Sequence, residues 1–539
     1  MTGLTEEKKF SSEKNRWLML PVLLVIATFI ISLGYGFVSD DRIFLIDNPN
    51  FLSQPILKYF QHGVWKFSAL DLPEGQLYRP MGLLLLRGVA ELSGPNPFGY
   101  HLAQVLAHSI VTVLVFFLLA SIVTDASGKA LALATSVFAI HPIQVESVCW
   151  IGGIDVWTAL FTFTAILLLF HVKDKRRIYI LALSMIMVFA AMLSKETAYT
   201  LPGLLILLLF IREEAFGRKK IMYLAALSGI PLVIVFWLRK SAVEAPHFVY
   251  SVEGGKNLVM YFLGYLKMVV LPLPQRFYLS EPAGGSVAAW EIVLGTLVLI
   301  GFVSLVLYIK DGRRLFLCSA GWYLLTLGPA LAVAFHTARA TFASRLLYLP
   351  SFALSLILLW LMTHGPAKRR KIIERGGVIV MMLFTVASMW TRSSWRDQGS
   401  FLEMAMSSTP DNIALNNNMG DYYSEIGKRD EAIESYRFVV TAALNKRHVN
   451  KRDKALAHER LGRIYAKAKS WDKARSEFEA ILLIDPGNSS ARNDLGNIAW
   501  LSGDLITAKK HYEMALLNDP ENTIAQQNLS AVNRLLSKQ

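Results

Sequence analysis

Long apolar runs separated by short charged loops fill roughly the first 390 residues of this 539-residue chain. The first run, 17–36, follows a basic segment and is long enough to cross a hydrocarbon core as an α-helix, which takes about 20 residues. No small-residue cleavage site clearly closes it, so we expect a retained transmembrane helix rather than a signal peptide. Because lipid leaves backbone polar groups no partner outside the segment, repeated runs of this kind restrict the chain to a helical membrane bundle.

Ten further apolar runs predict ten further crossings, although several are shorter than the usual span. They lie at roughly 99–122, 130–143, 154–171, 178–193, 197–211, 220–238, 289–309, 315–335, 346–363 and 373–391. The apolar stretch 258–274 is treated differently because Lys267 lies in its middle and two prolines lie at its end. It predicts a re-entrant or interface-lying helix, which leaves about eleven transmembrane helices.

The basic loops set an orientation. With a cytoplasmic amino terminus, every strongly basic short loop falls on the cytoplasmic side, as the positive-inside rule requires. These loops are 172–177, 212–220, 310–314 and 364–375. Residues 37–98, 239–288 and the carboxy-terminal part are then non-cytoplasmic. We favour a bacterial inner membrane with a periplasmic carboxy-terminal domain; in a eukaryote that domain would be lumenal, in the endoplasmic reticulum.

Charge and cysteine content exclude several other classes of protein. The net charge is +14, but many Lys and Arg residues form short clusters between apolar runs, which argues against nucleic-acid binding. Only 18% of residues are charged and 53% are hydrophobic, with a mean hydropathy of +0.39. Cys149 and Cys318 are the only cysteines, so a disulfide framework and a cysteine-based zinc site are both disfavoured.

Charged and amide residues replace the apolar runs after about Trp390. We therefore predict an all-α protein with a membrane domain at 1–391, a linker at 392–412 and a water-soluble domain at 413–539. Within the last, 413–446, 455–488 and 489–522 align on one template, and Gly462 and Gly496 are 34 residues apart, the tetratricopeptide period. The first repeat carries eight extra residues, and 523–536 resembles a capping helix.

Such an array forms an α-solenoid, whose concave groove suits a polypeptide partner or acceptor. The alternative is a structural or self-association module with no role toward a substrate.

Two adjacent carboxylates, Asp40 and Asp41, follow the first helix. Alone they could be solvated flanking charges or a helix cap. The next spanning run carries His101 and His108 on one helical face, and polar residues on a spanning helix generally face the bundle interior or a cavity. Each histidine alone could equally be a packed, hydrogen-bonded group.

Further polar residues occupy the predicted outer ends of later runs. They are His141, Glu146, Asp155, Lys195, Glu196, Arg345 and Tyr348, while Arg79 lies in the first external segment. A carboxylate pair beside basic groups is what sugar transfer from a lipid-linked phosphate requires, because the carboxylate accepts the proton of the attacking hydroxyl and the cations hold the phosphate. Arg345 and Lys195 could alternatively be interface anchors.

Taken together in this order, these residues resemble the GT-C superfamily of lipid-phosphate-sugar glycosyltransferases. The resemblance is to the transmembrane and tetratricopeptide-repeat-containing protein O-mannosyltransferases. It rests on Asp40-Asp41, Tyr78-Arg79-Pro80, His101 through His108, His141-Pro142 through Glu146, Ser194-Lys195-Glu196, Arg345 through Ser351, and the repeats.

The resemblance implies an inverting transfer of a hexose such as mannose from a polyprenyl or dolichyl phosphate to a protein hydroxyl outside the cytoplasm. Carried over, Asp40 or Asp41 is the base, with Asp40 preferred because it lies nearer the membrane. Arg79, Lys195 and Arg345 bind the donor phosphate. The residues that shape the site are His101, His108, His141, Glu146, Glu196 and Tyr348. Gln104, Gln144 and the turn Gly152-Gly153-Ile154-Asp155 depart from the family pattern.

No cofactor or metal motif is evident in the sequence, and the donor is a lipid-linked substrate. Three alternatives remain at this point. The first is a glycosyltransferase that acts on a lipid or surface polysaccharide, and the second is a non-catalytic membrane scaffold built on the repeats. The third, a transporter, is disfavoured because no two-fold repeat of the membrane half is visible.

Overall fold

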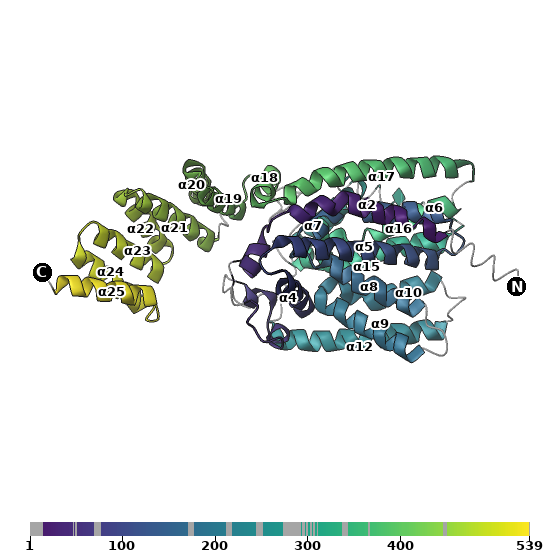
Figure 1. Cartoon of the computed structure of the whole chain (residues 1–539), viewed down its shortest axis with the longest axis horizontal. Coiled ribbons are helices and arrows are strands. Elements are labelled where there is room, and N and C mark those ends of the chain that lie inside the picture. Colours follow the sequence, from purple (N-terminus) through teal and green to yellow (C-terminus); the bar gives the residue numbers. More distant parts are fainter. Residues whose placement is uncertain are drawn as a thin grey trace. The chain divides into compact units, whose positions relative to one another are not determined.

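The chain divides into two units, Met1–Phe401 and Leu402–Gln539, in the computed structural model (Figure 1). The structure describes residues 14–537 apart from 47, 49–50, 69–76, 171–176, 212–217, 244–251, 273–292, 337–342, 365–366 and 446–449, and only scattered positions of 293–310. Its described residues contain helices and no β-strand, which confirms the predicted all-α class.

Apolar helices form the body of the first unit. Among the described residues, five are long and apolar enough to cross a membrane: α2 Met19–Phe29 with its 3₁₀ continuation η1 Ile30–Gly34, α5 Pro97–Ile122, α12 Arg218–Ala242, α15 Arg313–His336 and α17 Arg370–Arg392. Shorter apolar helices are α6 Gly128–Ala139, α8 Asp155–Phe170, α9 Arg177–Ser194, α10 Leu201–Ile211, α13 Val252–Val270 and α16 Phe352–His364. The first unit is therefore that of an integral membrane protein.

The count of eleven crossings stays a prediction. The expected span 289–309 lies largely outside the described residues. The stretch 258–274 contributes to α13, whose Tyr261 and Tyr265 are buried against Leu327 of α15. The re-entrant or interface-lying placement of this stretch stays a prediction. Two spans differ in detail, since α6 stops before His141-Pro142 and α16 begins six residues after the predicted start.

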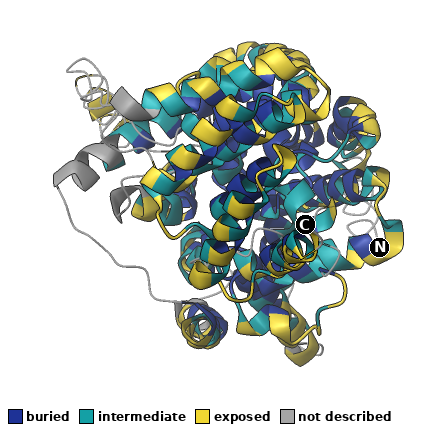
Figure 2. Ribbon diagram, turned by 90° about the vertical axis from the view of Figure 1, so that its left-hand side faces the viewer, coloured by how far each residue is buried: buried dark blue, intermediate teal, exposed yellow. Residues whose placement is uncertain are grey.

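Exposed positions recur along the outer helices (Figure 2), and many of them carry large apolar side chains, as a bilayer requires. On α17 the exposed side chains Ile379, Leu383, Val386 and Trp390 recur at spacings of three and four residues. This spacing places them along one face of the helix. In water such a stripe would be an aggregation hazard, whereas in lipid it faces hydrocarbon at no cost.

Short helices gather at the ends of the spanning helices. They are η2 Arg42–Ile46, α3 Lys58–Gln61, η3 Val64–Phe67, α4 Pro80–Ser93, α7 Gln144–Cys149, η5 Glu196–Thr200, η6 Ser344–Leu347, η8 Ser393–Trp395 and α18 Gln398–Ser408, while η7 Ala367–Arg369 precedes α17. Residues 37–98 have a small apolar core of their own, in which Phe44, Phe51, Tyr59 and Phe67 pack on Leu83. This core supports the segment on which the acidic pair lies.

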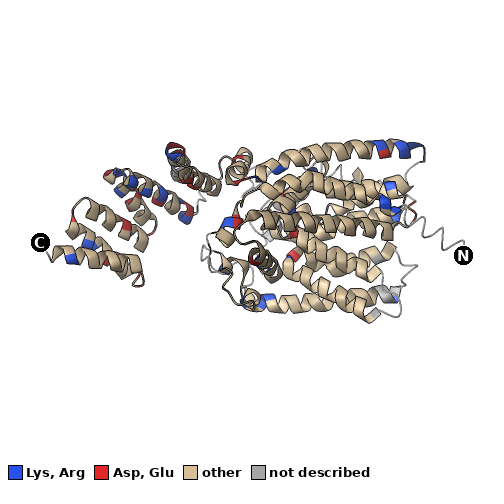
Figure 3. Ribbon diagram, viewed as in Figure 1, with Lys and Arg blue, Asp and Glu red and all other residues tan. Residues whose placement is uncertain are grey.

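Four of the membrane helices begin with a basic residue. Arg177, Arg218, Arg313 and Arg370 are the first residues of α9, α12, α15 and α17. Each of these helices extends from its basic first residue toward the other end of the bundle. The segments that follow α9 and α17 therefore lie at that other end (Figure 3). The bundle therefore has one end marked by basic helix starts and another that carries Lys195 and Trp395.

The second unit contains three helix pairs and a last helix. They are α19 Ile413–Glu425 with α20 Arg429–Asn445, α21 Lys451–Lys467 with α22 Trp471–Ile484, α23 Ser489–Leu501 with α24 Leu505–Asn518, and α25 Thr523–Leu536. This confirms the repeat architecture. The extra residues between the first two repeats lengthen helices, because α20 and α21 each have 17 residues, whereas α22 has 14 and α23 has 13.

Close approach of the paired helices explains the repeated glycines. A Cβ atom on Gly462 would lie 2.8 Å from the Phe478 ring, and one on Gly496 would lie 2.6 Å from the Tyr512 ring. The turn between the paired helices needs a left-handed residue at one position, filled by Gly427 and Gly503 with φ of 78° and 88°. In the second repeat Lys469 takes this position with φ of 58°.

The Lys469 turn yields a stability prediction. A left-handed conformation costs a non-glycine residue roughly 1–2 kcal/mol, which glycine does not incur. We expect Lys469→Gly to raise the free energy of unfolding of the repeat unit by about 1 kcal/mol, and Gly503→Lys to lower it by a similar amount. Chemical denaturation of the purified full chain measures both.

Lys510→Gly is the matched control, because Lys510 is exposed inside α24 and glycine in a helix interior costs about 1 kcal/mol. A loss of stability in Lys469→Gly equal to that of the control would contradict this account of the turn.

Candidate functional site

A cavity of about 330 Å³ opens among the short segments at the end of the bundle opposite the basic helix starts. Its polar lining includes six residues singled out from the sequence: Asp40, Asp41, Arg79, Glu146, Lys195 and Arg345. Its apolar lining comes mainly from α4 and from tryptophans, among them Trp65, Trp150, Trp157 and Trp395. The cavity therefore has a charged region beside an apolar wall.

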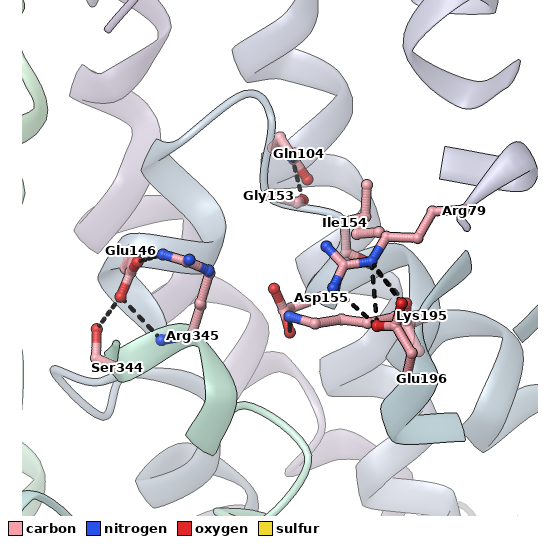
Figure 4. A network of polar contacts seen from close by, with 11 residues as sticks. Arg79, Gln104, Glu146, Gly153, Ile154, Asp155, Lys195, Glu196, Ser344 and Arg345 are labelled. Carbon is pink, nitrogen blue, oxygen red and sulfur yellow. Dashed lines mark hydrogen bonds and ion pairs between the residues drawn. The ribbon is translucent and has the colours of Figure 1, made fainter. Parts of the chain in front are cut away.

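Three ion pairs fix the basic residues of the cavity (Figure 4). Lys195 Nζ lies 2.5 Å from Asp155 Oδ1. Arg79 donates through Nε and Nη2 to the carboxylate of Glu196, with the shortest contact at 2.8 Å. Arg345 donates through Nη1 to Glu146, whose other oxygen accepts from Ser344 Oγ at 2.7 Å and from the Arg345 amide at 2.9 Å.

Local breaks in the helices place these cations. Arg79 directly precedes Pro80, and a residue before proline is pushed out of the helical region, so α4 begins after it. Lys195 has φ of −158° and ψ of 148°, which ends α9 and separates it from η5. Arg345 lies in the short helix η6 that follows the undescribed residues 337–342. Each cation thus lies where a helix begins or ends.

The pairs differ in exposure. The Lys195 side chain is 4% exposed, while the side chains of Arg345 and Arg79 are 27% and 22% exposed. Burial lowers the pKa of the Lys195 ammonium, and the neighbouring Asp155 carboxylate opposes that shift. The Arg345 guanidinium also lies over the Trp150 ring, 4.9 Å from its centroid. Only the two arginines therefore present appreciable surface to the cavity.

Asp41 is engaged by the backbone. Its Oδ1 accepts from the Gly152 amide at 2.7 Å and its Oδ2 accepts from the Val38 amide at 3.3 Å. Burial raises the pKa of Asp41 to about 8, against the opposing effect of these amides. The Asp41 carboxyl therefore ties the loop after η1 to the turn after α7, and is ill suited to accept a proton at neutral pH.

Asp40 is placed differently. Asp40 is a half-buried residue that lines the cavity, and its carboxylate accepts a hydrogen bond from the Ser39 side chain. Burial raises the pKa of Asp40, while the positive charge of Arg345 lowers it. A carboxyl that lines a cavity and has a raised pKa is a better proton acceptor than an ordinary surface aspartate.

The other residues expected to shape the site lie behind the cavity wall. Glu196 binds Arg79. His108 Nδ1 lies 2.5 Å from the Tyr348 hydroxyl, and its Nε2 lies 2.8 Å from the Ala139 carbonyl. His101 lies 3.4 Å from the Gly36 carbonyl.

His141 lies 3.1 Å from the Val269 carbonyl, and burial lowers its pKa to about 4. His101, His108, His141 and Tyr348 thus join packed segments rather than line the cavity.

Other functional residues were not assigned a role from the sequence. Asp155 was noted only as an outer-end residue, although it is the partner of Lys195. Gln104 Nε2 donates to the carbonyls of Trp150, Ile151 and Gly153, which fixes the turn that binds Asp41. The Gly-Gly pair offered a signal for this turn, because a Cβ on Gly152 would lie 3.1 Å from Asp41 Oδ1.

Metal ligands are not grouped in the described residues, where no cluster of three or more His, Cys, Asp or Glu side chains could hold an ion. The absence of a metal and of a cofactor stays a prediction.

Comparisons with known proteins match both units. Residues 74–238 match the dolichyl-phosphate-mannose-protein mannosyltransferase family, and 413–445 match the tetratricopeptide repeat. Protein O-mannosyl-transferase F38B6.6 of Caenorhabditis elegans is 23% identical over 447 residues, which cover 80% of this chain and 63% of the relative. Human protein O-mannosyl-transferase TMTC4 is 24% identical over 482 residues, covering 77% and 64%.

Among solved structures, ArnT from Cupriavidus metallidurans bound to undecaprenyl phosphate covers 75% of this chain and 80% of its own, with 11% identity and a TM-score of 0.41. The chain spans slightly less than two thirds of the two O-mannosyl-transferases above. The family matches and these relatives confirm the resemblance drawn from the sequence.

The Lys195–Asp155 pair yields a second prediction. Breaking a buried pair leaves an uncompensated charge and costs about 3–5 kcal/mol. We expect Asp155→Asn to lower the thermal unfolding temperature of the purified protein, and the double variant Asp155→Leu with Lys195→Met to recover most of the loss.

Glu91→Gln is the control, because it breaks the more exposed Arg87–Glu91 pair and should cost less than about 1 kcal/mol. A double variant no more stable than Asp155→Asn would show that the buried charge is not the cause.

Proposed function

We propose that this chain is an inverting glycosyltransferase of the non-cytoplasmic membrane face. It moves a hexose such as mannose from a polyprenyl or dolichyl phosphate to a hydroxyl group of a polypeptide. The observation that carries the proposal is the position of Asp40, a half-buried residue that lines the same cavity as Arg79 and Arg345. The named relatives, which are protein O-mannosyl-transferases, support the choice of sugar and acceptor.

Asp40 serves as the general base. The acceptor oxygen forms a bond to C1 of the sugar, on the face opposite the phosphate, and its proton passes to Asp40. The bond from C1 to the phosphate oxygen breaks at the same carbon, and polyprenyl phosphate leaves with the electron pair. Attack from the opposite face inverts the configuration at C1. Asp41 holds the loop in place through its bonds to Val38 and Gly152.

Arg345 and Arg79 bind the leaving phosphate. Arg345 engages Glu146 through Nη1, and Arg79 engages Glu196 through Nε and Nη2, so each guanidinium retains N–H groups beyond those used in its ion pair. Their carboxylate partners hold the planes of the guanidinium groups in fixed orientations, which favours planar recognition of phosphate oxygens. The Lys195 side chain is almost fully buried, so Lys195 contributes positive charge to the site without exposing appreciable surface to the cavity.

The apolar wall suits the lipid part of the donor. Leu83, Leu86 and Val89 of α4 line the cavity beside the charged region. A polyprenyl chain bound along this wall would leave its phosphate beside the arginines. The repeat unit is proposed to engage the acceptor polypeptide or a protein partner, since helical repeats of this kind offer extended binding surfaces.

Orientation follows from the direction of the helices. The basic starts of α9, α12, α15 and α17 are at the end of the bundle away from the cavity, and basic loops favour the cytoplasm. The cavity then opens to the periplasm of a bacterium, or to the lumen of the endoplasmic reticulum in a eukaryote.

Separate substitutions of the two aspartates test the proposal. Asp40→Asn removes the base and should lower kcat for hexose transfer by about 10²–10⁴-fold. Asp41→Asn keeps an oxygen for the Gly152 amide, so we expect kcat within about tenfold of the wild type. Transfer of labelled hexose from a polyprenyl-phosphate donor to a polypeptide by the full chain in lipid measures both.

Dependence on pH provides an independent check on Asp40. A base acts in its deprotonated form, so a raised pKa places the loss of kcat at a higher pH than for an ordinary carboxyl, and the loss grows as the pH falls. Wild-type kcat in Asp40→Asn would reject the base assignment. Transfer to a lipid or polysaccharide but to no polypeptide would reject the acceptor class.

A further inference from the structure

The segment between α17 and α18 forms part of the wall of the cavity. Trp395 of η8 and Phe401 of α18 both line it, and their ring centroids are 5.1 Å apart. The same segment contains the last residues of the membrane unit, which ends at Phe401. The chain therefore passes beside the candidate site immediately before the repeat unit begins at Leu402.

Two hydrogen bonds join this segment to the loop that carries Asp40. The Gly36 amide donates to the Arg396 carbonyl at 2.9 Å. The Ser39 amide donates to Gln398 Oε1 at 2.8 Å. The residues joined by the second bond are 359 positions apart in sequence, so this contact is a product of the fold rather than of local structure.

Ser39 has an unfavourable backbone conformation. Its φ is 54°, and only one other described non-glycine residue, Lys469, has a positive φ. A left-handed residue without glycine costs roughly 1–2 kcal/mol and persists only where surrounding contacts hold it. The Gln398 side chain provides one such contact on the Ser39 amide, and the Asp41 bonds to Val38 and Gly152 provide others.

The direction of the Asp40 carboxylate depends on this conformation, because Ser39 immediately precedes it. If the Ser39 amide lost its acceptor, the residue could relax to an ordinary negative φ, and the Asp40 side chain would turn relative to Arg345 and Arg79. Displacements of about 1 Å in a reacting group can cost as much as 10²-fold in rate.

We propose that Gln398 is a positioning residue, which holds Ser39 in its left-handed conformation and so aims the Asp40 carboxylate into the cavity. The inference rests on the proposed function for its effect on catalysis. The proposal also gives residues 396–398, next to the repeat unit, a role in the site, because their displacement would change the direction of the Asp40 carboxylate. Gln398 itself does not touch the reacting atoms.

The test uses the full chain in lipid and compares two substitutions of one side chain. Gln398→Leu has a similar size but no acceptor oxygen. We expect at least a tenfold lower kcat, a donor KM within about twofold of the wild type, and at least tenfold faster hydrogen exchange of the Ser39 amide. Gln398→Glu retains the acceptor oxygen, so it should keep Ser39 protected. Its added negative charge near Asp40 should move the acidic limb of the kcat profile to higher pH.

Glu403→Leu is the matched control on α18, because Glu403 is exposed on the same helix, and we expect no change in kcat or in Ser39 exchange. Wild-type kcat in Gln398→Leu overturns the proposal, as does a fall in kcat without faster Ser39 exchange. If the wild-type chain transfers no hexose, the proposed function fails, and Ser39 exchange then decides the positioning contact by itself. Unchanged exchange in Gln398→Leu would overturn it.

Discussion

The ion pair between Lys195 and Asp155 is the interaction on which the candidate site depends most. Both side chains are almost fully buried, and their charged atoms lie 2.5 Å apart. The pair joins the start of α8 to the residue that ends α9, and the next residue, Glu196, binds Arg79 at the start of α4. Three segments of the bundle are thus joined by adjacent residues at one end. A charge buried in this way is tolerated only with its partner, which makes the arrangement of this end of the bundle specific.

The same pairing determines what the cations can do. Three unpaired cations would repel one another and would attract any anion. In this site each cation has its own carboxylate partner, which fixes the orientation of its side chain. The net charge of the lining at neutral pH then depends largely on Asp40, because the raised pKa of Asp41 keeps that carboxyl mostly protonated. Because Asp41 is buried and bound by backbone amides, the two neighbouring aspartates have different chemistry in spite of their adjacency. Environment, rather than residue type, separates the proposed proton acceptor Asp40 from the structural carboxyl of Asp41.

Much of this could be predicted from the sequence, and the limits have physical causes. Hydrophobic run length predicted the membrane helices, and the 34-residue period predicted the repeats, because both depend on local chemistry. The order of motifs assigned Asp40, Arg79, Lys195 and Arg345 to one site, and the structure places all four around one cavity, while their roles stay predictions. The sequence could not show that the cations are paired, since Glu146 and Arg345 are 199 positions apart. Nor could it show the left-handed Ser39, whose conformation is held by the distant Gln398.

The central claim is that one cavity holds the donor phosphate beside Asp40. The most direct measurement is an experimental structure of the full chain in a lipid nanodisc with polyprenyl phosphate bound. The account predicts phosphate density within hydrogen-bond reach, about 2.7–3.2 Å, of Arg345 and Arg79, with the Asp40 carboxylate facing the same space. Phosphate density only at the basic starts of α12 and α17, or in a cavity that lacks Asp40, would contradict it.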